Sequence, residues 1–63
     1  MKLDELITII SSKTGNSINQ SMLAESLGIT RQTVSNRIKN ESEVTVSELI
    51  RAEKYFDIRL FVS

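Results

Sequence analysis

The sequence predicts an all-α fold, a single compact domain of four or five short helices. Three observations predict it: apolar residues recur at helical spacing, Asn and Thr residues stand where helices would begin, and the two glycines stand where two helices would end. The chain has 63 residues, 40% of them hydrophobic and only 5% aromatic, so it can build one small core, mainly of Leu, Ile and Val. We therefore expect residues 1–63 to form one domain.

The first two helices are expected over about 3–13 and 20–27. One face of the first carries Leu3, Leu6, Ile7 and Ile10, and Gly15 is a natural stop. Asn19 is the expected cap of the second helix, which Gly28 ends. Its inward residues are expected to be Leu23, Ala24 and Leu27, with Met22 at the edge.

A third helix is expected over 31–40, with Thr30 as its cap. Val34 and Ile38 are its only apolar residues, one turn apart, so most of the helix surface must face outward.

The fourth helix begins at a capping-box pattern, Thr45 followed by Glu48, and is expected to end near residues 55–57. Its buried side is expected to contain Val46, Leu49, Ile50, Ala52 and Phe56. Residues 41–44 are read as a loop. For residues 58–63 we expect an extended segment, with a short C-terminal strand or a fifth helical turn as alternatives.

The charge of the chain is unevenly distributed. The net charge is zero, which argues against a DNA binder without sequence preference, because such proteins are usually basic. Residues 28–40 nevertheless contain Arg31, Arg37 and Lys39 and no acidic residue. Three cations in thirteen residues also fit an ordinary solvated helix face, so charge alone does not decide the function.

The composition also argues against several function classes. The chain has no His and no Cys, which removes the usual catalytic triads, thiol nucleophiles and metal clusters, and it has no Gly-rich phosphate loop. We expect no enzymatic activity, no cofactor, no metal and no small-molecule ligand. No apolar run approaches the roughly 18 residues of a membrane span, and no signal-peptide pattern is present, so we expect a soluble, cytoplasmic protein without a membrane partner.

Residues 20–39 have the pattern of two short helices joined by a tight turn. Ala24 is small where the helices would cross closely, and Gly28 can take the positive φ that ends the first helix. Ile29 would fill the space in the turn, and Val34 and Ile38 would anchor the second helix. This pattern favours a helix-turn-helix, whose second helix can enter the DNA major groove, about 12 Å wide.

Over roughly residues 3–57 the chain resembles the phage Cro and repressor proteins. The matching string is Gln20…Leu23-Ala24…Leu27-Gly28-Ile29-Thr30…Val34-Ser35. The segment Thr33-Val34-Ser35 with Ile38 and Val44-Thr45 is also similar to the headpiece of lac-type repressors. Those headpieces normally lack a preceding helix and are followed by a hinge and a sugar-binding domain, so the Cro and repressor family is the nearer resemblance. Arg37 departs from that family's pattern, which often has a small or apolar residue there.

The resemblance implies a repressor-like transcriptional regulator that reads operator DNA with residues 31–40. The implied base-contacting residues are Arg31, Gln32, Ser35 and Asn36. This fits their chemistry, because Arg can pair with guanine, and Gln or Asn with adenine, through two hydrogen bonds. The implied phosphate-contacting residues are Gln20, Thr30, Thr33, Arg37, Lys39 and Asn40. In the family a Gln at the position of Gln20 also steadies the first base reader, here Arg31.

The expected partners are double-stranded operator DNA and a second copy of the chain, because family members usually bind as symmetric dimers. The expected dimerisation residues are Ile58, Leu60, Phe61 and Val62, in the tail 58–63. These residues could equally fold back to complete the core, and the two interpretations are compatible. Two alternatives remain open: a protein-interaction or anti-repressor module on the same scaffold, and an accessory DNA-binding protein for site-specific recombination.

Overall fold

The computed structural model describes residues 1–60 and confirms the all-α prediction. The helices of this part are α1 (Leu3–Thr14), α2 (Gln20–Leu27), α3 (Arg31–Lys39) and α4 (Val46–Phe56). The only β feature within residues 1–60 is an isolated antiparallel bridge between Lys2 and Glu43. None of these helices has the length and apolar character that a membrane crossing needs.

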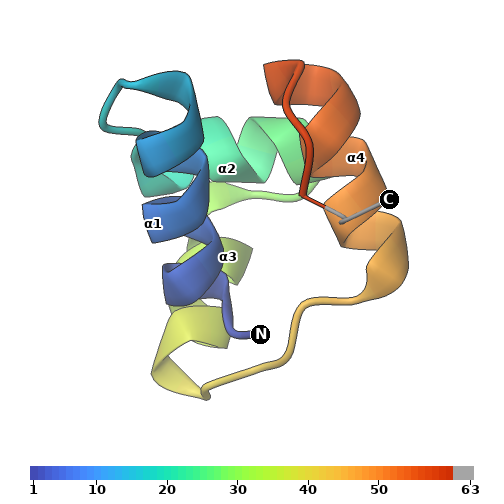
Figure 1. Cartoon of the computed structure of the whole chain (residues 1–63). Coiled ribbons are helices and arrows are strands. Elements are labelled where there is room, and N and C mark those ends of the chain that lie inside the picture. The colour runs from blue at the N-terminus through green and yellow to red at the C-terminus, as the bar shows by residue number, and fades with distance from the viewer. Residues whose placement is uncertain (61–63) are drawn as a thin grey trace.

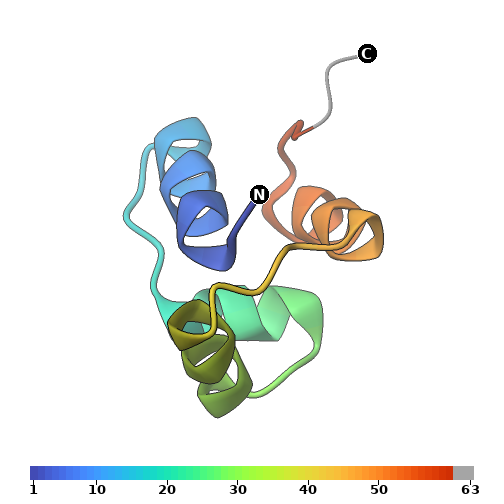
Figure 2. The same cartoon turned by 90° about the horizontal axis from the view of Figure 1, so that it is seen from below.

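The central helix is α2, which packs against both α3 and α4, while α1 packs against α3 (Figure 1). Viewed from below, α1 and α4 lie side by side with a space between their axes, and α2 and α3 lie across the same side of both (Figure 2). This arrangement places α3 at the edge of the molecule, with one side against the core and the other directed outward.

Helices α2, α3 and α4 begin with the same local pattern. Asn19, Thr30 and Thr45 each accept a hydrogen bond through a side-chain oxygen from the backbone N–H three residues later. Each cap is also flanked by two apolar residues of the core, one directly before the cap and one four positions after the cap. The pairs are Ile18 and Leu23, Ile29 and Val34, and Val44 and Leu49. Such apolar pairs fix the angle at which the chain enters a helix.

The core contains the residues that helical spacing predicts. Leu3, Leu6 and Ile10 from α1 meet Leu23, Ala24 and Leu27 from α2, Val34 from α3 and Ala52 from α4. Ile18, from the loop before α2, is also buried. Gly15 and Gly28 end α1 and α2 in the left-handed region, as the sequence predicts.

Two predictions for α4 are wrong. Val46 is 63% exposed and Ile50 is 41% exposed, although both were expected on the buried side. The buried stripe of the helix is formed by Ala52, with Leu49 and Phe56 partly buried against the core. Ile50 follows Leu49 by 100° around the helix axis, so a helix that turns Leu49 inward turns Ile50 away from the core.

The segment after α4 folds back along that helix (Figure 1). Asp57 ends α4 with φ 53°, the N–H of Ile58 donates to the carbonyl of Glu53 at 3.1 Å, and the N–H of Leu60 donates to Oε2 of Glu53 at 2.7 Å. Ile58 and Leu60 are half-buried against the core, and residues 58–60 form neither a strand nor a helical turn. Phe61 and Val62, the other expected dimerisation residues, lie outside the described residues.

Candidate nucleic-acid interface

The turn between α2 and α3 sets the direction of α3. Gly28 has φ 70°, and the N–H of Ile29 donates to the carbonyl of Ala24 at 3.0 Å, which reverses the chain within two residues. Arg51 of α4 reaches across and donates from Nη1 to the carbonyl of Leu27 at 3.0 Å. The last turn of α2 is therefore tied to α4 through a side chain, and α3 starts from a fixed point.

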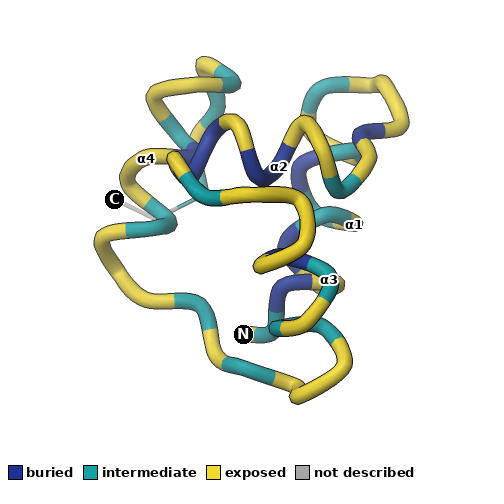
Figure 3. The backbone as a smooth tube through the Cα atoms, turned by 180° about the vertical axis from the view of Figure 1, so that it is seen from behind, coloured by how far each residue is buried: buried dark blue, intermediate teal, exposed yellow. Residues whose placement is uncertain are grey.

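Helix α3 is attached to the core through a narrow apolar stripe. Val34 is fully buried and Ile38 packs against the core from one turn further along. The remaining residues of α3 are exposed or intermediate, and Figure 3 shows exposed stretches of α3 interrupted by buried and intermediate ones. Its exposed residues are Arg31, Gln32, Thr33, Asn36 and Lys39, and Asn40 is exposed at the cap.

The outward residues form two rows along α3. Arg31, Ser35 and Lys39 repeat every four residues and make a cationic row. Gln32, Asn36 and Asn40 repeat in the same way beside it and make an amide row. Within residues 1–60, Arg31 and Lys39 make no ion pair or hydrogen bond through their side chains, so both positive charges are available to a partner. No acidic residue lies on α3.

The start of α2 and the start of α3 meet at a surface hollow of about 310 Å³, lined by Gln20, Arg31, Gln32 and Ser35. Sequence reasoning expected Gln20 to lie beside the first base reader, and the structure brings it to the same hollow as Arg31. Three of the four expected base-contacting residues of α3 therefore share one small surface with an amide from α2.

Thr30 and Thr33 lie at the N-terminus of α3, and their hydroxyl groups are hydrogen-bonded to each other. Oγ1 of Thr30 accepts from the backbone N–H of Thr33 at 3.1 Å, and the two hydroxyl oxygens are 2.8 Å apart. The hydroxyl of Thr30 is thus used for capping, as the sequence suggested. Both residues are exposed beside the cationic row.

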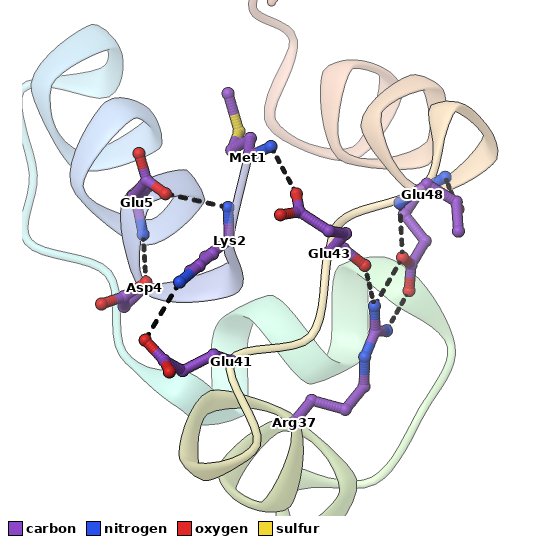
Figure 4. Close-up of polar contacts among 9 residues, drawn as sticks. Met1, Lys2, Asp4, Glu5, Arg37, Glu41, Glu43 and Glu48 are labelled. Atoms are coloured by element: carbon purple, nitrogen blue, oxygen red, sulfur yellow. Dashed lines mark hydrogen bonds and ion pairs between the residues drawn. The ribbon is translucent and has the colours of Figure 1, made fainter.

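Arg37 does not have the free guanidinium that a phosphate contact needs. Its guanidinium forms a two-pronged ion pair with the carboxylate of Glu48 on α4, and Nη2 also donates to the carbonyl of Glu43 at 2.9 Å (Figure 4). The side chains of Arg37 and Glu48 are only 22% and 16% exposed. This pair joins α3 to α4 and explains why a long cationic residue stands where an apolar one is more usual in the resembled family.

The same pair controls the protonation of Glu48. The hydrogen bond from Arg37 lowers the pKa of the Glu48 carboxyl to about 2, and hydrogen bonds from Thr45 add to the effect, against the opposing influence of partial burial. Glu48 therefore stays charged in any neutral solution. It serves both as the capping-box residue of α4 and as the counter-ion of Arg37.

The loop between α3 and α4 is also tied to the N-terminal segment (Figure 4). Nζ of Lys2 lies 3.0 Å from the carboxylate of Glu41, the α-ammonium of Met1 lies 2.7 Å from Glu43, and the N–H of Val44 donates to the carbonyl of Met1 at 2.8 Å. The hydrogen bond from the ammonium lowers the pKa of Glu43. These contacts hold the loop that follows the end of α3.

Sequence reasoning missed two of the residues that position α3. Glu48 was recognised only as a cap, and Arg51 was assigned no role. Their partners lie 11 and 24 positions away in other elements, and a spacing of that kind carries no periodic signal. The part of the chain that the structure describes holds no cluster of three metal-ligating side chains.

The comparisons with known proteins address the fold and the site together. A model of the helix-turn-helix family matches residues 15–62, which cover α2, the turn, α3 and α4. No curated protein and no solved structure matches the chain closely enough to add to this assignment. The match covers most of the chain and includes the whole surface described above, so the chain belongs to the helix-turn-helix family of DNA-binding domains.

Proposed function

We propose that the chain is a sequence-specific transcriptional regulator of the phage Cro and repressor type, which reads operator DNA in the major groove with α3. One observation carries the proposal: the outward face of α3 is exposed, free of acidic residues, and carries cations and amides that are the side chains best suited to base edges and phosphates.

The proposed base-contacting residues are Arg31, Gln32, Ser35 and Asn36. The proposed phosphate-contacting residues are Gln20, Thr30, Thr33, Lys39 and Asn40, which surround the first set. We leave Arg37 out, because a guanidinium already paired with Glu48 would have to give up that carboxylate to meet a phosphate.

We further propose that the regulator acts as a homodimer in the cytoplasm, on operator DNA. One helix reads only a few base pairs, and two copies related by a two-fold axis would read half-sites about one helical turn apart. The proposed dimer contact is the tail: Ile58 and Leu60, which are half-buried against their own core, with Phe61 and Val62, which lie outside the described residues.

Selection of bound sequences from a random DNA pool tests the proposal. We expect a two-fold symmetric consensus, bound with a dissociation constant on the order of 10⁻⁸ M at physiological salt. Arg31→Ala should relax the preference at one base position, whereas Lys39→Ala should weaken binding to all duplexes alike. Selection of no consensus by the wild-type chain would contradict the proposal.

A second candidate is a protein-interaction module on the same scaffold. Val46 and Ile50 are large apolar residues one turn apart on the outside of α4, and the chain as a whole has no net charge. This candidate predicts that Ile50→Glu abolishes binding of a protein partner, and that the wild-type chain shifts no DNA even at low salt. A specific DNA shift that Ile50→Glu leaves intact would contradict it.

A further inference from the structure

Gln32 and Asn36, neighbours in the amide row, are joined to each other. Nε2 of Gln32 donates to Oδ1 of Asn36 at 3.1 Å, across one turn of α3. Both side chains are exposed, so burial does not force them together. Gln followed by Asn or Asp four residues later is a favourable hydrogen-bonded pair on a helix surface.

The bond matters because a primary amide has two different edges. Its oxygen accepts, and its nitrogen carries two hydrogens, one on the same side as the oxygen and one on the far side. The major-groove edge of adenine offers an N6 donor beside an N7 acceptor, which matches the oxygen and the near-side N–H of an amide. Turning the amide by 180° exchanges oxygen and nitrogen and removes this match.

We infer that Asn36, included above among the proposed base-contacting residues, acts instead as a positioning residue, which holds the amide of Gln32 in the orientation that reads adenine. The inference assigns this bond to the far-side hydrogen of Nε2, so that Oε1 and the near-side N–H of Gln32 remain as the acceptor and donor that adenine requires. Guanine presents two acceptors at the same place, so the fixed amide can satisfy only one of them. The inference rests on the proposed function and names the base that one residue of the site selects.

The experiment uses the full chain and the duplex that the wild-type protein selects. The position read by Gln32 is the one at which Gln32→Ala removes the base preference. Two duplexes are compared that differ only at this position, where one has guanine and the other adenine. The ratio of their dissociation constants is measured for each variant. We expect Asn36→Ala to lower this ratio about fivefold or more, and the double variant to lower it no further than Gln32→Ala alone.

Asn36→Asp is the matched control, because a carboxylate can only accept and so keeps Gln32 in the same orientation. This variant should keep the preference for adenine, but its affinity for every duplex should fall, because the new carboxylate is repelled by the phosphates. Lys39→Ala should lower the affinity for the guanine and adenine duplexes equally and leave the ratio of their dissociation constants unchanged. If Asn36→Ala instead changes the preference at a different base position, additively with Gln32→Ala, Asn36 reads its own base and the inference is overturned.

A measurement without DNA separates this inference from the proposed function. In NMR spectra of the free chain, the far-side amide proton of Gln32 should shift and exchange faster in Asn36→Ala, but not in Asn36→Asp. An unchanged Gln32 amide in Asn36→Ala overturns the inference even if the chain binds its operator. If the wild-type chain selects no duplex, the proposed function is contradicted, and the inference that Gln32 reads adenine fails with it.

Discussion

At the scale of single residues, Gly28 carries two constraints. Its φ of 70° disfavours any side chain, and a Cβ placed there would lie 3.1 Å from Nη1 of Arg51. Gly15 has a similar φ of 74° but open space around it. We expect Gly15→Ala to lower the free energy of unfolding by about 1 kcal/mol, the cost of the left-handed conformation, and Gly28→Ala to lower it by more.

Urea unfolding of the two variants measures this difference. The additional loss at Gly28 has a physical cause, because the guanidinium of Arg51 would have to shift by a few tenths of an ångström, which strains its 3.0 Å hydrogen bond to the carbonyl of Leu27. Equal losses in both glycine variants would mean that the guanidinium moves aside at no cost, and would contradict a positioning role for Arg51.

Two valines make a second matched pair. Val34 is completely buried at the centre of the attachment of α3, whereas Val46 is 63% exposed. We expect Val34→Ala to lower the free energy of unfolding by about 2 kcal/mol through lost burial and a small cavity, and Val46→Ala to change it by less than about 0.5 kcal/mol. Thermal or urea unfolding compares them, and a loss at Val46 equal to that at Val34 would contradict the exposed position of Val46.

The same valines show why apolar spacing predicted only part of the core. Val46 lies three residues before Leu49 and so falls on the periodic stripe of α4. It is nevertheless the first residue of α4, directly after the loop that arrives from α3, and it is left exposed. Spacing identifies the face of a helix, but the length over which that face is covered depends on the neighbouring elements.

At the scale of elements, helix starts were the most predictable feature of the chain. The caps Asn19, Thr30 and Thr45 act on neighbours three residues away, and such local contacts can be read directly from the sequence. The burial of Ile18 was missed, yet it had a signal: an apolar residue directly before a cap, with another four positions after it.

The tie between α3 and α4 predicts a dependence of stability on pH. Glu48 has a folded-state pKa of about 2, below the ordinary value of 4.5, so its contribution is complete above about pH 4.5 and is lost as the pH falls towards 2. Because solvent screens a partly exposed pair, its contribution is smaller than the full shift would give, on the order of 1 kcal/mol. We expect the unfolding free energies of the wild type and Glu48→Gln to differ most at neutral pH and to converge over this window.

Denaturant unfolding at several pH values tests this expectation, and Arg37→Met provides the control. Without the guanidinium, the main cause of the lowered pKa is absent, so the variant should lose most of the same acid dependence. A constant difference between the wild type and Glu48→Gln from pH 7 to pH 2 would contradict the assigned pair.

At the scale of the whole molecule, the sequence predicted the surface better than it predicted what holds that surface in place. The outward rows of α3 follow from the spacing of Val34 and Ile38, and the structure exposes them as expected. The ion pair of Arg37 with Glu48 could not be predicted, because it depends on how α4 lies against α3. Arg37 was for that reason assigned to DNA rather than to the fold.

The distribution of charge over the molecule leads to the last prediction. The chain is neutral as a whole, so any salt dependence of DNA binding must come from local cations rather than from the total charge. Lys39 lies in the last turn of α3, within the proposed interface, and Lys13 lies in the last turn of α1. Figure 1 shows these two helices ending at opposite ends of the molecule. Changing either residue to Ala alters the net charge equally, which makes the two variants a matched pair.

We expect Lys39→Ala to reduce the slope of log K against log salt concentration by about one, because one phosphate contact releases about one counterion. Lys13→Ala should leave the slope at the wild-type value. Mobility-shift titrations at several salt concentrations measure both slopes. If the two variants reduce the slope equally, the duplex responds to the overall charge of the protein, and α3 is not the surface that meets the phosphates.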